Sequence, residues 1–339
     1  LNPRNGLVER FGLPPGTRFV TETQRIAAAG GGNSVAMVQI DGNRMGSVAR
    51  ELASRAHLDG GRDYETFSEI LRASTQAAAA AALAAVMPVD GGEIAARPIV
   101  LGGDDLGIVL PPAVALDFVC RFLDRFEKET EARLAEARST EDVLKGVPTR
   151  FSAGAGIAWA HSHYPFDQAH GMAGSLCHWA KESLHAADGD TRMPPSAVAF
   201  FRLTSSMVSE FDTVLANELS EGGRTLTMGP YVLGDPPKGL ATLKQLQDLC
   251  RAAARMPGGS WRKLVSAAHQ GQLATKNHLR RMVETAADKD KAAQELRQAL
   301  ADMGCGDSEG VSGFDRAGRT PILDVETLQA VGAWGREDA

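Results

Sequence analysis

The chain has 339 residues, of which 43% are hydrophobic and 23% are charged, a balance typical of a folded protein that is long enough for two domains. Its formal net charge of −6 argues against a protein whose whole surface coats nucleic acid, but a local basic groove remains compatible with it. The longest apolar stretch, residues 77–87, is too short and too rich in alanine to span a bilayer, so we expect no membrane partner. Four scattered cysteines without C-x-x-C spacing are typical of reduced thiols in a cytoplasmic protein.

The N-terminal part leads into a buried strand that ends in an acidic loop. Residues 1–33 are rich in Gly, Pro and Arg, and we interpret them as a linker segment with one short helix around residues 21–29. An apolar run over residues 35–40 predicts the first core strand, and the loop Asp41–Gly46 follows it. A carboxylate at the end of a strand, followed by glycine and a helix, can hold a cation while the loop backbone approaches a phosphate.

A second acidic stretch lies in a predicted hairpin. Apolar runs on both sides of Gly102–Asp105 predict two strands within residues 97–110, joined at this four-residue tip. The simplest interpretation is a surface turn, because Gly and Asp are common turn residues. If the strand over residues 35–40 lies beside the hairpin, however, Asp41 and Asp104 face each other at one edge of the sheet. Such oxygen ligands suit Mg²⁺ bound with substrate phosphates, and two such ions can promote phosphoryl or nucleotidyl transfer.

The rest of this region alternates helices and strands. After the first strand we expect two helices, the hairpin, a helix, a strand, a helix and a final strand (47–56, 64–86, 97–110, 113–138, 151–160, 166–186 and 196–201). This order describes an α+β domain, a ferredoxin-like palm in which an antiparallel sheet carries helices on one face. We place the palm at residues 34–208. The small residues of the strand at 151–160 indicate that another element packs closely on it.

Histidines and one lysine in the palm have both structural and functional interpretations. His161 and His163, with three more histidines at spacings of eight and seven on the predicted helix 166–186, suggest a metal site. Histidines two turns apart rarely share one ion, so we interpret them as structural residues. Lys181, near the end of the same helix, is placed either to reach the phosphates of a ligand at the hairpin or to lie in solvent.

The last part of the chain, residues 209–339, predicts a helical domain. A short extended piece precedes four helices, and one more short ordered segment follows them (225–233; 240–255, 261–270, 273–286 and 288–303; 319–325). Seven basic residues of these helices are compatible with a positive surface and equally with solvated helix faces, which are the commoner case (Arg251, Arg255, Arg262, Lys263, Lys276, Arg280 and Arg281).

Four motifs, taken in this order, resemble a known family. They are Ile40 to Gly46, Leu101 to Asp105, Phe151 to Ala158 with Tyr164-Pro165, and Ala180-Lys181. Their combination resembles the catalytic palm of the large subunit of type III CRISPR effector complexes, the CRISPR-associated protein ten family, whose wider relatives are the GGDEF-type nucleotide cyclases. Gly229-Pro230-Tyr231 and the helical segment also look like the C-terminal part of that family, so the resemblance covers roughly residues 35–330.

The resemblance implies a nucleotidyltransferase that converts ATP into cyclic or linear oligoadenylates, which are second messengers in antiviral defence. Asp41 and Asp104 would bind two Mg²⁺ ions, for which Mn²⁺ could substitute, and Asp105 would assist them. The nucleotide would lie against seven further positions (the Ile40 carbonyl, Gly42, Asn43, Arg44, Gly102, Gly103 and Lys181). The partners would be ATP and either the other subunits of an effector complex with guide and target RNA, or a second copy of the chain.

Two departures from the family pattern leave alternatives open. The acidic loop often reads Asp-Gly-Asp in the family, whereas Asn43 stands at its third position here. Because only 34 residues precede the first predicted strand, we expect either a fragment of a longer subunit or a compact relative that dimerises. The alternative functions are a dinucleotide cyclase that uses GTP or mixed nucleotides, and a non-catalytic palm that binds nucleotide as a scaffold in an RNA-guided complex.

Overall fold

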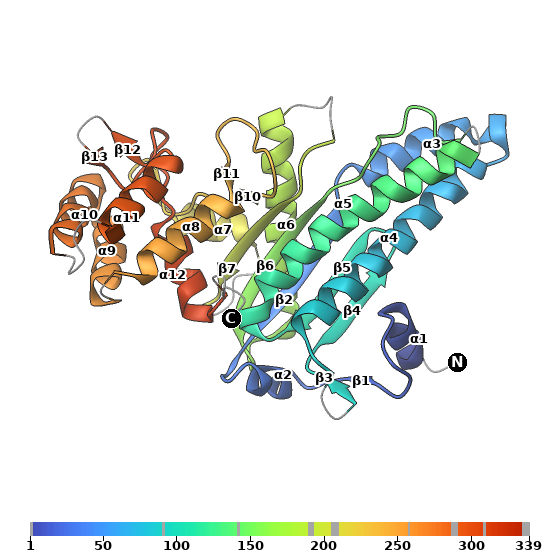
Figure 1. The fold of residues 1–339 in the computed structure, drawn as a ribbon, viewed down its shortest axis with the longest axis horizontal. Helices are drawn as coiled ribbons and strands as arrows, with labels where there is room; N and C mark the ends of the chain where they lie inside the picture. The colour runs from blue at the N-terminus through green and yellow to red at the C-terminus, as the bar shows by residue number, and fades with distance from the viewer. Residues whose placement is uncertain are drawn as a thin grey trace.

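The computed structural model describes most of the chain (residues 3–89, 92–140, 143–188, 193–204, 210–256, 258–285, 291–307 and 310–333). A palm with one large sheet is followed by a helical region (Figure 1). The palm contains all the elements predicted for it, in the predicted order, together with the short β3 and η1, which were not predicted (β2 Ser34–Gly42, α3 Met45–Asp59, α4 Arg62–Val86, β3 Glu93–Ile94, β4 Arg97–Gly102, β5 Asp105–Leu110, η1 Pro112–Val114, α5 Ala115–Thr140, β6 Ala153–His161, α6 Phe166–Asp188 and β7 Ala197–Arg202).

The strand order of the sheet confirms the predicted fold class. The seven strands run in the order β11-β10-β7-β6-β2-β5-β4, and β6, β2, β5 and β4 pair antiparallel in the arrangement of a ferredoxin-like palm. The register places Ile40 of β2 between Ala155 of β6 and Leu106 of β5. β7 differs from the predicted antiparallel pattern, because it follows the crossover helix α6 and pairs parallel to β6.

Helices lie on both faces of this sheet. Figure 1 shows α4 and α5 lying together across one face, and Ile40, Ala155 and Leu106 are buried there. Asp41 and its partner Gly154 are one residue further along, so they point to the opposite face. The expected arrangement of helices on one face therefore holds for α4 and α5, whereas α6 packs on the other face.

The glycines of β6 explain why α6 packs where it does. A Cβ added at Gly154 would lie 2.5 Å from Lys181 Cγ, and one added at Gly156 would lie 2.0 Å from the Ala173 carbonyl oxygen. No residue larger than glycine fits at Gly156 without moving the helix. The prediction that another element packs closely on this small-residue strand is confirmed.

Residues 1–33 contain more regular structure than the linker segment with one helix that the sequence predicted. The expected short helix is α2 (Thr23–Ala29), and it is preceded by α1 (Pro3–Arg10) and β1 (Arg18–Phe19). β1 pairs parallel with β3. The Arg10 guanidinium donates to the Leu101 carbonyl oxygen at 3.1 Å, which fastens α1 to the strand that leads into the hairpin tip.

The helical region confirms the four predicted helices and adds short elements that the periodicity did not indicate (α7 Phe211–Asn217, β8 Ser220–Glu221, β9 Arg224–Thr225, β10 Tyr231–Val232, β11 Ala241–Thr242, α8 Leu243–Ala254, α9 Gly258–Gln270, α10 Gln272–Thr285, α11 Lys291–Asp302, β12 Gly306–Asp307, β13 Gly310–Val311 and α12 Ile322–Val331). β10 pairs antiparallel with β7, so this region extends the palm sheet. The domain boundary expected at residue 208 lies outside the described residues, and the division into domains stays a prediction.

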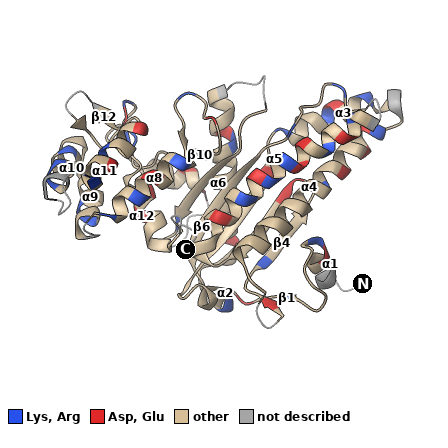
Figure 2. Ribbon diagram, in the orientation of Figure 1, with Lys and Arg blue, Asp and Glu red and all other residues tan. Residues whose placement is uncertain are grey.

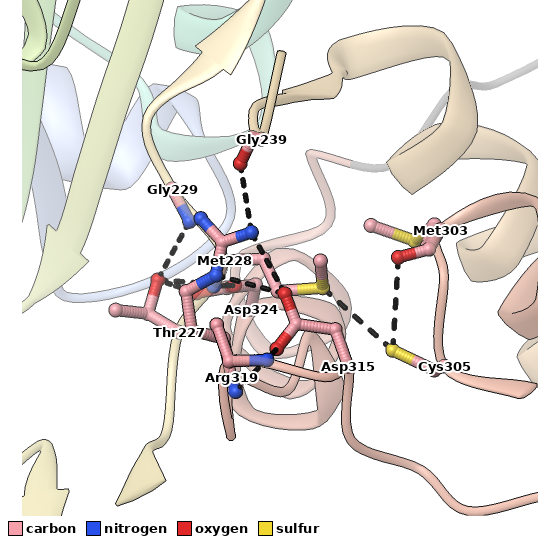
Figure 3. A network of polar contacts seen from close by, with 10 residues as sticks. Thr227, Met228, Gly229, Gly239, Met303, Cys305, Asp315, Arg319 and Asp324 are labelled. Atoms are coloured by element: carbon pink, nitrogen blue, oxygen red, sulfur yellow. Dashed lines mark hydrogen bonds and ion pairs between the residues drawn. The ribbon is translucent and has the colours of Figure 1, made fainter. Parts of the chain in front are cut away.

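A buried acid holds this region together. Asp324, at the start of α12, accepts hydrogen bonds from the Thr227 hydroxyl at 2.9 Å, the Met228 backbone N–H at 2.9 Å and the Tyr231 hydroxyl. Figure 3 shows Asp324, Thr227 and Met228 of this network beside the ion pair in which Arg319 reaches Asp315. Because Tyr231 also lies on β10, the network joins α12 to the palm sheet. Among the described residues, none of the helices combines the length and the apolar character needed to cross a membrane.

Candidate metal and nucleotide site

Asp41 stands where β2 reaches the edge of the palm. The strand is buried through Ile40, and α3 begins at Met45 after a short loop. A Cβ added at Gly42 would lie 2.8 Å from Asp104 Oδ2 and 2.6 Å from Met45 Cγ. Glycine at this position therefore lets the hairpin carboxylate approach the backbone of the acidic loop.

The hairpin tip is tighter than the sequence predicted. Gly102 pairs with Asp105, so only Gly103 and Asp104 form the turn between β4 and β5. Gly103 has a φ of +60°, whereas Asp104 is not among the residues with positive φ. Positive φ at the first central residue alone is typical of a type II′ turn, which favours glycine there. The turn projects Asp104 and Asp105 from the end of the hairpin.

Three carboxylates meet at this edge of the sheet. Asp41, Asp104 and Asp105 each offer an oxygen atom, and these atoms lie within 4.8 Å of one another. Desolvation by surrounding protein atoms and the charge of Asp41 raise the pKa of Asp104. Desolvation, and then the charges of Asp41 and Asp104, raise the pKa of Asp105 to about 6. Like charges at this spacing favour protonation unless a cation compensates them.

Lys181 supplies one such cation from α6. Its ammonium lies 2.5 Å from Asp41 Oδ2 and donates to the Gly42 carbonyl oxygen at 2.8 Å. The helix can place Lys181 there because Gly154 of β6 leaves room for the lysine stem. The same charge lowers the pKa values of Asp104 and Asp105, against the effect of their desolvation. The sequence did not distinguish this arrangement from a solvated lysine.

The donor set fits the expected metal. Carboxylate oxygens are hard ligands, and a site with few of them suits Mg²⁺ that keeps waters and substrate phosphates as further ligands. Within the parts of the chain that the structure describes, no other group of three His, Cys, Asp or Glu side chains is close enough to hold an ion. The histidines therefore do not assemble a metal site among these residues.

The other expected nucleotide-binding positions differ in their exposure. Gly103 is exposed at the tip and Gly102 is half-buried at the end of β4, whereas Arg44 is half-buried in the loop before α3, with a φ of +62°. Ile40 turns its side chain into the core, which is compatible with the backbone role expected of it. Asn43 differs from expectation, because its side chain is fully buried and its amide donates to Ser152 Oγ at 2.9 Å.

Comparison with protein families identifies the palm. The model of the family Cas10/Cmr2, second palm domain, matches residues 34–187, which hold Asp41, the hairpin tip and Lys181. Residues 34–187 are thus similar to the second palm domain of Cas10/Cmr2. This family indicates the large subunit of type III CRISPR effector complexes, as the sequence motifs predicted. No curated protein matches the chain.

The palm also contains a groove that the sequence did not reveal. A cavity of about 230 Å³ lies between the hairpin and α6 and begins at Asp41, Asp105 and Lys181. Further along, Gln39 Nε2 lies 2.5 Å from His170 Nε2. The groove also has lining residues that precede Lys181 by whole turns on one face of α6 (His170, Gly174 and His178). That periodicity is the signal that would have connected these histidines to the site.

Proposed function

We propose that this chain is an Mg²⁺-dependent nucleotidyltransferase that joins ATP molecules into cyclic or linear oligoadenylates, which act as second messengers in CRISPR-type antiviral defence. The observation that supports this proposal best is the convergence of Asp41, Asp104 and Asp105 within 4.8 Å beside the Lys181 ammonium. A surface turn would have no need for three carboxylates at this spacing, because their mutual repulsion is unfavourable without a cation.

The reaction forms a bond between a ribose 3′-oxygen and the α-phosphorus of a second ATP. The bond from that phosphorus to the bridging oxygen breaks, pyrophosphate leaves, and the hydroxyl proton passes to water. Two bound Mg²⁺ ions would make the hydroxyl more acidic and neutralise the charge of the triphosphate. Asp41 and Asp104 would hold these ions with the assistance of Asp105, and Mn²⁺ could replace Mg²⁺.

The remaining residues position the nucleotide. Lys181 lies on the side of Asp41 that faces the groove, where its ammonium can pair with a phosphate oxygen. Gly103, exposed at the hairpin tip, leaves its backbone open to the triphosphate, and Gly42 lets Asp104 approach the acidic loop. In the proposed assembly the chain acts with the other subunits of an effector complex and its guide and target RNA, or as a homodimer that brings two nucleotides together.

The deciding experiment incubates the purified chain with labelled ATP or GTP and Mg²⁺, with and without RNA-loaded partner subunits, and identifies the products by mass. We expect oligoadenylates and pyrophosphate. The variant D104A/D105A should lose all product while its circular dichroism spectrum stays unchanged and its melting temperature does not fall, because Asp104 and Asp105 lie at the hairpin tip and repel Asp41.

Each other outcome has a definite meaning. Product from GTP would replace the proposal with a dinucleotide cyclase. Binding of ATP and Mg²⁺ without product in either setting would favour the scaffold. Synthesis that persists in D104A/D105A would show that the carboxylate group is not the catalytic site.

A further inference from the structure

A surface outside the palm carries an unusual distribution of charge. Residues 249–283 contain seven Lys and Arg and no Asp or Glu, in a chain whose formal net charge is −6. Most of this stretch forms α9 and α10, which pack against each other and are joined at Gly271. Figure 2 shows the basic residues of these helices at the end of the molecule opposite the N-terminus.

The two helices turn their basic sides outward. Trp261 of α9 and Leu279 of α10 are buried in the helical region, whereas Arg262, Lys263 and Arg280 are exposed. In the part of the chain that the structure describes, these three residues form no ion pair. Arg255, by contrast, pairs with Glu295 of α11. The charges of Arg262, Lys263 and Arg280 are thus not compensated by the described part of the protein.

Uncharged polar side chains accompany these basic residues on the same two helices. Four more exposed residues of the two helices are of this kind (Ser266, His269, Gln270 and Gln272). Leu273, at the start of α10, is the one large apolar residue of the described part of these helices that is exposed, at 73%. Protein interfaces have apolar and aromatic cores, whereas nucleic-acid interfaces are more polar and much more positive. The composition therefore favours a nucleic acid over an acidic protein.

We propose that the exposed sides of α9 and α10 around Arg262, Lys263 and Arg280, here called the α9–α10 surface, bind the sugar–phosphate backbone of a nucleic acid strand. Arg and Lys neutralise phosphates, and neutral donors hydrogen-bond to phosphate and sugar oxygens. Contacts of this kind bind without reading the sequence. The surface is separate from the carboxylate site, so this inference does not depend on the proposed enzymatic activity.

The test measures fluorescence polarisation of labelled 20-nucleotide RNA and single-stranded DNA of mixed sequence, from about 50 to 200 mM salt. The variant R262E/K263E/R280E is compared with R72E/R121E/K128E, which changes the net charge equally at exposed residues of α4 and α5. We expect the first variant to bind at least about tenfold more weakly and the control within about twofold of the wild type. The slope of log Kd against log salt should fall by about 2, at roughly 0.7 for each lost phosphate contact.

Circular dichroism should show both variants to be folded, because all six residues are exposed. Equal weakening by both variants would attribute the binding to net charge and overturn the proposal. A labelled polyglutamate peptide is tested in the same way. If it binds the wild type as tightly as RNA does, and if R262E/K263E/R280E no longer binds it, the surface would be assigned to an acidic protein instead. The nucleic acid that the wild type binds more tightly, RNA or single-stranded DNA, identifies the kind of strand that this surface binds.

Discussion

Lys181 is the residue that makes the carboxylate cluster compatible with a folded palm. Its ammonium bonds to Asp41 and to the Gly42 carbonyl oxygen, and its charge lowers the pKa values of Asp104 and Asp105. A triphosphate with its own Mg²⁺ would compete for this ammonium. We therefore expect Lys181 to have two roles, to compensate negative charge in the free protein and to bind a phosphate in the complex.

Lys181→Met should weaken the binding of a non-hydrolysable ATP analogue about tenfold to a hundredfold, because a hydrogen bond to a charged group contributes about 1.5–3 kcal/mol. Isothermal titration calorimetry in the presence of Mg²⁺ measures the change. Lys181→Arg keeps the charge and should lose less. Unchanged affinity in the Met variant would mean that the lysine serves Asp41 alone.

Asp324 is the second residue whose charge is coupled to the fold. Burial raises its pKa to about 6, although hydrogen bonds from Tyr231, Met228 and Thr227 act in the opposite direction. The folded protein therefore holds a proton on Asp324 that the unfolded chain releases above about pH 4. Its contribution to stability is largest below that pH, and it is lost as the pH rises through about 6.

The variant D324N tests this coupling because an amide does not titrate. The free energy of unfolding of the wild type, minus that of D324N, should fall by about 3 kcal/mol between pH 4 and pH 7, since a pKa difference of about two units corresponds to that energy. Urea unfolding at a series of pH values gives the difference, in which the other titrating groups cancel. If the free energies of unfolding of the wild type and D324N change in parallel with pH, Asp324 titrates at an ordinary pKa.

At the scale of elements, the contact between α6 and β6 positions the site. Gly154 and Gly156 bring the helix against the strand, and the helix then carries Lys181 to Asp41 and forms one wall of the groove. On the opposite face, α4 and α5 cover bulky buried residues of the same strands. The sheet thus has one face with bulky buried side chains, covered by α4 and α5, and one face with glycines, covered by α6. The carboxylates are on the face that α6 covers.

Gly156→Ala should destabilise the protein by about 3 kcal/mol, because its Cβ would lie 2.0 Å from the Ala173 carbonyl oxygen and 2.5 Å from the Cys177 nitrogen. The matched control is Gly174→Ala on α6, where nothing lies within 4 Å of an added Cβ. That variant should gain roughly 0.5–1 kcal/mol from helix propensity. Thermal and urea unfolding measure the stability change of each variant. Equal stability of the two variants would contradict the close packing at Gly156.

At the scale of the whole molecule, one sheet joins the palm to the helical region. Tyr231 and Val232 of β10 pair with Val198 and Ala197 of β7, and the Tyr231 ring stacks on Phe200 with centroids 5.7 Å apart. A single hydrophobic core includes buried residues from both parts. The two parts therefore support each other across β7.

We expect the full chain to unfold in one calorimetric transition and the fragment of residues 1–208 to melt at least about 10 °C lower or to aggregate. Removal of β10 exposes the edge of β7 and the Phe200 ring, and free strand edges promote association. Differential scanning calorimetry and light scattering measure both effects. A fragment that melts at the temperature of the full chain would establish an independent palm.

The sequence by itself determined the order of the palm elements and the element that carries each part of the site. Period-two and period-3.6 patterns are local, so the strand leading to Asp41, the hairpin that contains Asp104 and the helix carrying Lys181 could all be predicted from short windows. The glycines of the hairpin tip were equally informative, because their turn chemistry is local.

Only the tertiary structure decided which of these residues meet. The side of the sheet that α6 covers depends on the spaces left by Gly154 and Gly156 in register with β2, and this is a contact between segments far apart in the sequence. The burial of Asn43 against Ser152, the groove beside His170 and the pairing of β10 with β7 have the same origin. Each depends on long-range packing, which overrides local preference and leaves no periodic signal in a short window.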